Sequence, residues 1–127
     1  MPTITLLYAG LLGLLAMGLA ASCGRARGKT GIGIGDGGNE ELIIAMRRQA
    51  NFVEFAPIVL ILIGLLEMNG VSGTVIHALG AVFFVARLCH AFGFTVSHPA
   101  HVLRTVGAVG STLTLVVSSI WAIVVAI

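Results

Sequence analysis

The sequence predicts an all-α integral membrane protein, a left-handed antiparallel bundle of four helices in a single domain spanning residues 1–127. Composition is the first observation behind this fold class, since 57% of the 127 residues are hydrophobic and 9% are charged, against about 25% charged in a soluble domain. Long apolar segments separated by short polar connections are the second, and such connections make neighbouring helices antiparallel. No repeat of solenoid length is present.

The first apolar segment, about residues 3–22, is expected to be a retained membrane helix. Its stretch Ile4–Ala21 carries no charge, and 18 residues of helix cover about 27 Å, close to the hydrocarbon core of a bilayer. No Lys or Arg precedes the segment, and its basic neighbours follow it, which is the reverse of a signal peptide. A glycine-rich cytoplasmic loop is predicted next, at 24–39.

Three more helices are expected, at about 40–68, 72–96 and 99–127. Asn39 is a suitable N-cap for the first of these, because acidic residues then occupy its first turn. Pro99 suits the first position of the last helix, where its missing N–H costs nothing. These boundaries leave very short connections between the second, third and fourth helices.

The basic residues predict the orientation in the membrane. The loop at 24–39 carries three Lys/Arg residues, and Arg104 borders the connection between the third and fourth helices. Neither the other connection nor the chain ends carry any. By the positive-inside rule, both termini therefore lie on the non-cytoplasmic side.

Polar side chains of three helices are predicted to meet near the cytoplasmic surface. They are Arg47, Arg48, Asn51 and Glu54, then Arg87 and His90, which share a helix face with Phe94, then His101 and Arg104. The spacing places most of them on one face of each helix. Each charge at this depth costs about 2.5–3.5 kcal/mol, so the cluster needs partners or a cavity. Arginines outnumber the single Glu54, which indicates a site for an anion, and guanidinium groups bind both oxygens of a carboxylate.

The residues alone are also compatible with simpler, structural roles for these side chains. Glu54 can pair with Arg47 or Arg87 and only hold helices together. Arg104 can be an anchor at the membrane surface, and His90 can be a packing residue. Pro57, just beyond Glu54, either kinks the second helix or is tolerated within it.

The stretch RRQANFVEFAP at 47–57, followed by an apolar run, by ARLCHAFGF and by an arginine in the last helix, resembles the MAPEG family (membrane-associated proteins in eicosanoid and glutathione metabolism). The shared core is R-x-x-x-N-x-x-E-[FY]-x-P, here Arg47, Asn51, Glu54, Phe55 and Pro57. GDGGNEEL before this core, Glu67 with Gly70 after it, and the R-x-x-H of Arg87 and His90 are similar to bacterial members.

The resemblance implies a homotrimer in the bacterial inner membrane that binds glutathione near the cytoplasmic side. It implies a glutathione S-transferase of the microsomal type, or a glutathione peroxidase, that acts on lipophilic electrophiles or lipid hydroperoxides. The residues carried over for glutathione binding are Arg47, Arg48, Asn51, Glu54 and Arg87. Arg104 is similar to the arginine that activates the thiol, and His90 is a candidate acid or hydrogen-bond donor. Several eukaryotic members have tyrosines where His90 and Phe94 stand.

Two other functions are weighed against this one. A small multidrug transporter also has four short spans and a buried glutamate, but it places that residue in its first helix and uses it for cations. A MAPEG-like protein that has lost catalysis would serve a structural or lipid-binding role. The G-x-G-x-x-G of Gly33, Gly35 and Gly38 lacks the preceding strand of a dinucleotide site. Neither a metal site nor nucleic-acid binding is expected.

Overall fold

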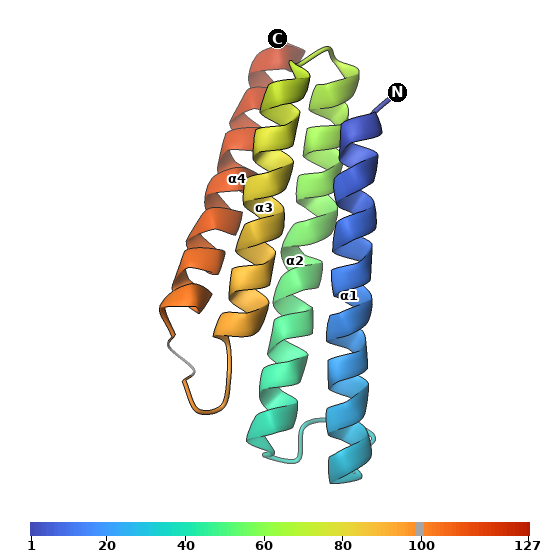
Figure 1. Cartoon of the computed structure of the whole chain (residues 1–127), viewed down its shortest axis with the longest axis vertical. Coiled ribbons are helices and arrows are strands. Elements are labelled where there is room, and N and C mark those ends of the chain that lie inside the picture. Colours follow the sequence, from blue (N-terminus) through green and yellow to red (C-terminus); the bar gives the residue numbers. More distant parts are fainter. Residues whose placement is uncertain (99–100) are drawn as a thin grey trace.

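The computed structural model describes residues 1–98 and 101–127 and shows four helices. They are α1 (Thr3–Thr30), α2 (Glu40–Met68), α3 (Gly73–Gly93) and α4 (Val102–Ala126). The helices run up and down side by side, so that both termini lie at the same end of the bundle (Figure 1). All four are long and apolar enough to cross a membrane. The all-helical, four-span fold class is thus confirmed, and no strand occurs in the described part of the chain.

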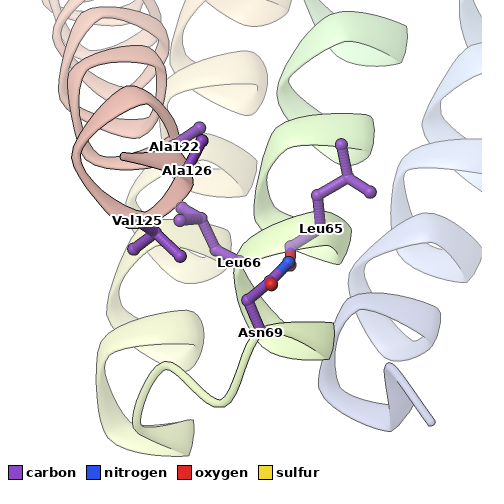
Figure 2. A pocket seen from close by; sticks show the side chains of 6 residues that line it. All are labelled: Leu65, Leu66, Asn69, Ala122, Val125 and Ala126. Carbon is purple, nitrogen blue, oxygen red and sulfur yellow. The ribbon is translucent and has the colours of Figure 1, made fainter.

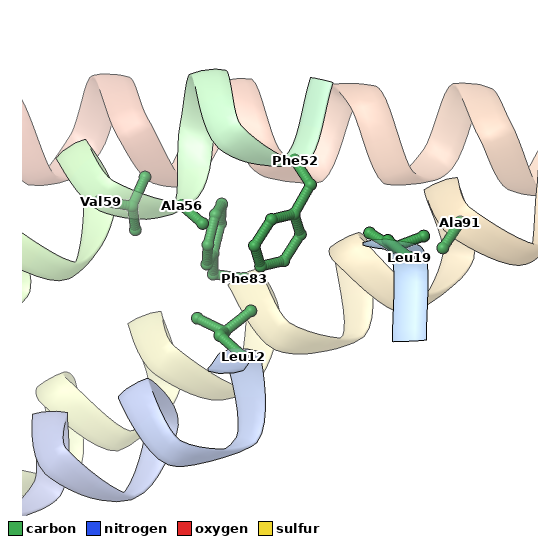
Figure 3. Close-up of a cluster of buried hydrophobic side chains, with 7 residues drawn as sticks. All are labelled: Leu12, Leu19, Phe52, Ala56, Val59, Phe83 and Ala91. Carbon is green, nitrogen blue, oxygen red and sulfur yellow. The ribbon is translucent and has the colours of Figure 1, made fainter. Parts of the chain in front are cut away.

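The core lies between α1, α2 and α3 at mid-height of the bundle. It is a cluster of buried apolar side chains, shown in Figure 3: Leu12, Leu19, Phe52, Ala56, Val59, Phe83 and Ala91. α2 runs continuously through Pro57. Most other large apolar side chains are exposed on the outside of the bundle, where a bilayer rather than the protein interior would cover them.

The first helix is longer than the sequence suggested, since α1 continues to Thr30 instead of ending near residue 22. The glycines at 24 and 28 do not break it. Its added turns are stabilised by Cys23 and Ala26, which pack against α2, and by Arg27 and Lys29 in the last turn, where cations favour the helix dipole. The helix ends at Gly31, whose φ of 69° only glycine adopts easily.

The connection between α1 and α2 is consequently short, and the Arg27 side chain binds three of its carbonyls. The Arg27 guanidinium donates to the carbonyls of Ile32, Gly33 and Gly35, at 3.1, 3.3 and 3.0 Å. Asn39 then caps α2 as predicted, its side chain accepting the N–H of Leu42 at 3.0 Å. The loop is therefore ordered by contacts to its backbone.

The third and fourth helices are shorter than predicted. α3 begins after Ser72 and ends at Gly93 rather than Val96, because Phe94 has extended backbone angles and turns the chain toward α4. α4 begins at Val102, with the His101 side chain accepting the N–H of Leu103. The predicted helix start at Pro99 lies outside the described residues.

Polar contacts join α1 to its neighbours at the end of the bundle that holds the termini. The Glu67 carboxylate accepts the N–H groups of Ile4 and Thr5 at 2.9 and 2.8 Å, and the Thr5 hydroxyl at 2.7 Å. The Tyr8 hydroxyl donates to the His77 carbonyl at 3.1 Å. Glu67 thus caps the N-terminus of α1 from another helix, which satisfies donors that a helix cannot satisfy itself.

Replacing Glu67 by alanine is expected to lower the free energy of unfolding by about 1 kcal/mol, the usual effect of losing a cap. Unfolding of the detergent-solubilised protein measures this. Glu41→Ala in the same helix is the matched control, because Glu41 pairs with Lys29 at 3.0 Å on the exposed surface, where ion pairs contribute little. Equal losses in the two variants would contradict a capping role for Glu67.

Candidate functional site

A charged cavity lies between α2, α3 and α4, at the end of the bundle away from the termini. Its volume is about 140 Å³, and we name it the arginine cavity. The side chains that line it are Arg47, Ala50, Asn51, Glu54, His90, Phe94 and Arg104. Three helices therefore bring predicted site residues together as the spacing of the sequence indicated.

Cavities without charged lining residues lie elsewhere on the bundle. One of about 170 Å³ lies between the ends of α2 and α4 and is lined by Leu65, Leu66, Asn69, Ala122, Val125 and Ala126 (Figure 2). The amide of Asn69 donates to the Leu65 carbonyl at 2.8 Å. Because its remaining lining is apolar, this cavity offers no charged group for binding an anion.

Arg87 does not line the arginine cavity but lies behind it, with only 2% of its surface exposed. Its guanidinium donates to the Asn51 side-chain oxygen at 2.8 Å and to the Gly107 carbonyl at 3.3 Å. The guanidinium carbon also lies 5.2 and 5.7 Å from the ring centroids of Phe55 and Phe83, within cation–π range. Arg87 thus fixes Asn51, which itself faces the cavity.

Arg48 also lies outside the cavity lining. Its Nε donates to the Phe94 carbonyl at 2.6 Å, and its Nη2 donates to the same oxygen. This carbonyl belongs to the residue where α3 ends, so it has no partner within the helix. Arg48 therefore ties α2 to the start of the α3–α4 connection.

Arg104 and His90 meet at the ring of Phe94. The guanidinium carbon of Arg104 lies 4.0 Å from the ring centroid, a close cation–π contact. The buried His90 ring lies 6.1 Å from that of Phe94 in an edge-on arrangement. The two predicted catalytic residues are therefore brought to one aromatic side chain.

Glu54 is not in an ion pair with Arg47 or Arg87. Across the described ranges, Lys29–Glu41 is the one ion pair within 4.0 Å. Glu54 and Arg47 are both exposed on the surface of the bundle while lining the cavity. The structure therefore does not show the simpler role of Glu54, which is to pair with Arg47 or Arg87 and hold helices together.

The sequence indicated which helix faces converge. It did not indicate which residues line the cavity and which support it from outside. Arg47, Asn51, Glu54, His90 and Arg104 line the cavity, whereas Arg48 and Arg87 support it from outside. The sequence placed Phe94 in the same layer as Arg104, one helical turn after His90, but it did not identify the cation–π contact between Phe94 and Arg104.

Comparisons with known proteins agree with the motif-based resemblance. The chain matches the MAPEG family over residues 5–124. It is 38% identical over 91 residues to the inner membrane protein YecN of Escherichia coli strain K12. These 91 aligned residues make up 72% of this chain and 70% of YecN. YecN of Escherichia coli strain CFT073 matches equally well. No solved structure matches the chain.

Proposed function

Since the chain belongs to the MAPEG family, we propose that it is a glutathione-dependent membrane transferase or peroxidase for lipophilic electrophiles or lipid hydroperoxides. The observation that carries this proposal is the arginine cavity, whose lining includes Arg47, Asn51 and Arg104 and a single carboxylate, that of Glu54. Glutathione has two carboxylates and a thiol. Guanidinium groups suit its carboxylates, and a cation beside its sulfur favours the thiolate.

The volume of the cavity supports a site completed by a neighbouring copy. About 140 Å³ is below the roughly 300–1,000 Å³ of typical small-molecule sites, so one protomer would hold part of a tripeptide. Arg47 and Glu54 are exposed along a membrane-length helix, where uncovered charge is costly. A homotrimer with glutathione at the subunit interfaces would cover both residues and supply the remaining wall.

The chemistry follows from the thiolate. The thiol would lose its proton to solvent, and Arg104 would stabilise the negative sulfur. An electron pair of the sulfur forms a bond to carbon of the electrophile while the bond from that carbon to the leaving group breaks, and the leaving group keeps the electron pair of the broken bond. With a lipid hydroperoxide, two glutathione molecules would be oxidised to the disulfide as the peroxide is reduced to an alcohol and water. His90 would donate a hydrogen bond or a proton to the leaving group. The apolar exterior would let such substrates arrive from the bilayer.

The proposed location is the bacterial inner membrane, with both termini on the non-cytoplasmic side. The name of the Escherichia coli relatives supports the membrane, and the positions of Arg25, Arg27, Lys29 and Arg104 support the orientation. The arginine cavity would then face the cytoplasm, where a soluble thiol substrate can reach it.

Isothermal titration of the purified protein with reduced glutathione tests this function. Binding is expected, and Arg47→Ala or Glu54→Ala should weaken it roughly 10- to 100-fold, the effect of losing a hydrogen bond to a charged group. Glu40→Ala is the matched control for Glu54, because Glu40 is exposed in the first turn of the same helix.

The same titration separates the transferase from a transporter, and thiolate absorbance of the complex separates it from a protein without catalysis. A small multidrug transporter would bind lipophilic cations instead of glutathione, and absence of glutathione binding would contradict our proposal. A protein without catalysis would bind glutathione yet show no thiolate absorbance. Glutathione binding with a thiolate signal is the expected outcome.

A further inference from the structure

Phe94 occupies an unusual position among the charged groups of the arginine cavity. It is the first residue after α3, with φ −103° and ψ 97°. Its ring contacts Arg104 and His90, and its carbonyl accepts two N–H groups of Arg48. One residue thus connects the predicted thiolate partner in α4 with a second arginine in α2.

We propose that Phe94 positions the Arg104 guanidinium against the sulfur of glutathione, and that Arg48 holds Phe94 rather than binding glutathione. The inference rests on the proposed function and assigns to Phe94 and Arg48 roles that act through Arg104. Arg104 would be the residue that touches the substrate, and the other two are positioning residues.

The contacts of Arg48 show why its role differs from that of the arginines that line the cavity. Two guanidinium N–H groups of Arg48 donate to one backbone oxygen, and its side chain is absent from the lining of the cavity. A guanidinium binds a carboxylate best when two parallel N–H groups meet its two oxygens. Two N–H groups of Arg48 already donate to the Phe94 carbonyl, so Arg48 fixes the backbone where α3 ends.

The backbone around Phe94 is also fixed from the side of α4. A Cβ added to Gly93 would lie 2.3 Å from the backbone nitrogen of Arg104 and 2.7 Å from the Leu103 carbonyl carbon. The chain before Phe94 therefore packs directly on the first turn of α4. With both backbones in contact and the ring 4.0 Å from the guanidinium carbon, Arg104 has little freedom to leave its place.

Stacking on Phe94 also suits the charge that Arg104 would carry in catalysis. A cation–π contact involves the flat face of the guanidinium, whereas its hydrogen bonds are made in its plane. The ring thus restrains the side chain without accepting its N–H groups. A tyrosine ring would make the same contact, so the role depends on an aromatic ring and not on a hydroxyl.

The test compares Phe94→Leu and Phe94→Tyr with wild type in purified, detergent-solubilised protein. Phe94→Leu keeps the backbone carbonyl for Arg48 and removes only the ring. We expect near-normal glutathione affinity, a bound thiol whose pKa is higher by about one unit, and roughly tenfold lower kcat, in line with a desolvated cation–π contact. Phe94→Tyr should restore both values. Phe92→Leu is the matched control, since Phe92 is 72% exposed two residues away.

Arg48→Gln provides a second measurement that leaves the ring in place. It should raise the pKa of the bound thiol while glutathione affinity stays within a few-fold of wild type, and it decides the matter if Phe94→Leu fails to fold. A loss of affinity without a change in thiol pKa would show that Arg48 binds glutathione and overturn its assignment.

The results also separate this inference from the proposed function. Wild type that binds glutathione, together with a Phe94→Leu variant of unchanged thiol pKa and kcat, would overturn the positioning role alone. Wild type that does not bind glutathione would overturn both.

Discussion

Replacing Arg104 by glutamine is expected to raise the pKa of the bound glutathione thiol by about two units, back to about 8.5, the value of a free thiol. Two units correspond to about 2.7 kcal/mol, which one cation in a partly dry site can supply. Well below the original pKa, the thiolate fraction and kcat would fall roughly 100-fold. Arg104 lines the cavity at the Phe94 ring, so its removal changes the charge nearest the proposed sulfur position.

The pH dependence of kcat shows the direction in which the pKa of the thiol changes. The cation lowers the pKa of the thiol, so in wild type the rate should reach its plateau at lower pH than in the variant. In Arg104→Gln the whole profile should move to higher pH, and the two rates should approach each other above the free-thiol pKa. Thiolate absorbance of the bound complex measures the shift directly. Arg104→Lys keeps the charge and should retain part of the effect, whereas an unmoved profile in Arg104→Gln would rule out Arg104 as the thiolate partner.

Replacing Gly107 by alanine is expected to lower the free energy of unfolding by about 3 kcal/mol, a large effect for one methyl group. An ideal Cβ at Gly107 would lie 2.4 Å from the His90 nitrogen and 2.5 Å from the Ala86 carbonyl oxygen. Both atoms belong to the backbone of α3, so no side chain can rotate away. The two helices would have to separate, which would also disturb the hydrogen bond from Arg87 to the Gly107 carbonyl.

Unfolding of the purified protein in detergent, with glutathione binding as a second readout, tests this packing. Gly18→Ala is the control, because a Cβ at Gly18 in α1 meets no atom within 4 Å, and alanine is the better helix former by about 1 kcal/mol. The control should therefore be neutral or stabilising. Equal stability of Gly107→Ala and wild type would contradict close packing of α3 on α4.

Periodicity and hydropathy predicted the helices and the faces that converge, because these depend on regular spacing along the chain. Helix ends were less predictable. α1 continues past two glycines, since Cys23 and Ala26 find partners in α2, and α3 stops where Arg48 binds the Phe94 carbonyl. Both outcomes depend on residues distant in sequence.

The same reason limited the prediction of the site. The spacing of Arg47, Asn51 and Glu54 shows that they share a face, but it cannot tell an arginine that lines a cavity from one that supports it. Arg87 turned out to be buried against Asn51 and two aromatic rings. That distinction arises from the packing of three helices, which no single segment encodes.

The contacts of Arg27 make the connection between α1 and α2 tolerant of amino-acid substitutions. Arg27 donates to the main chain of residues 32, 33 and 35, and every residue type offers the same carbonyl. Exchanging the fully exposed Ile34 for a polar residue would leave these bonds intact. The constraint on this segment therefore falls on Arg27, on Asp36, whose side chain accepts the N–H of Gly38 at 2.9 Å, and on glycines with left-handed backbone angles, such as Gly35.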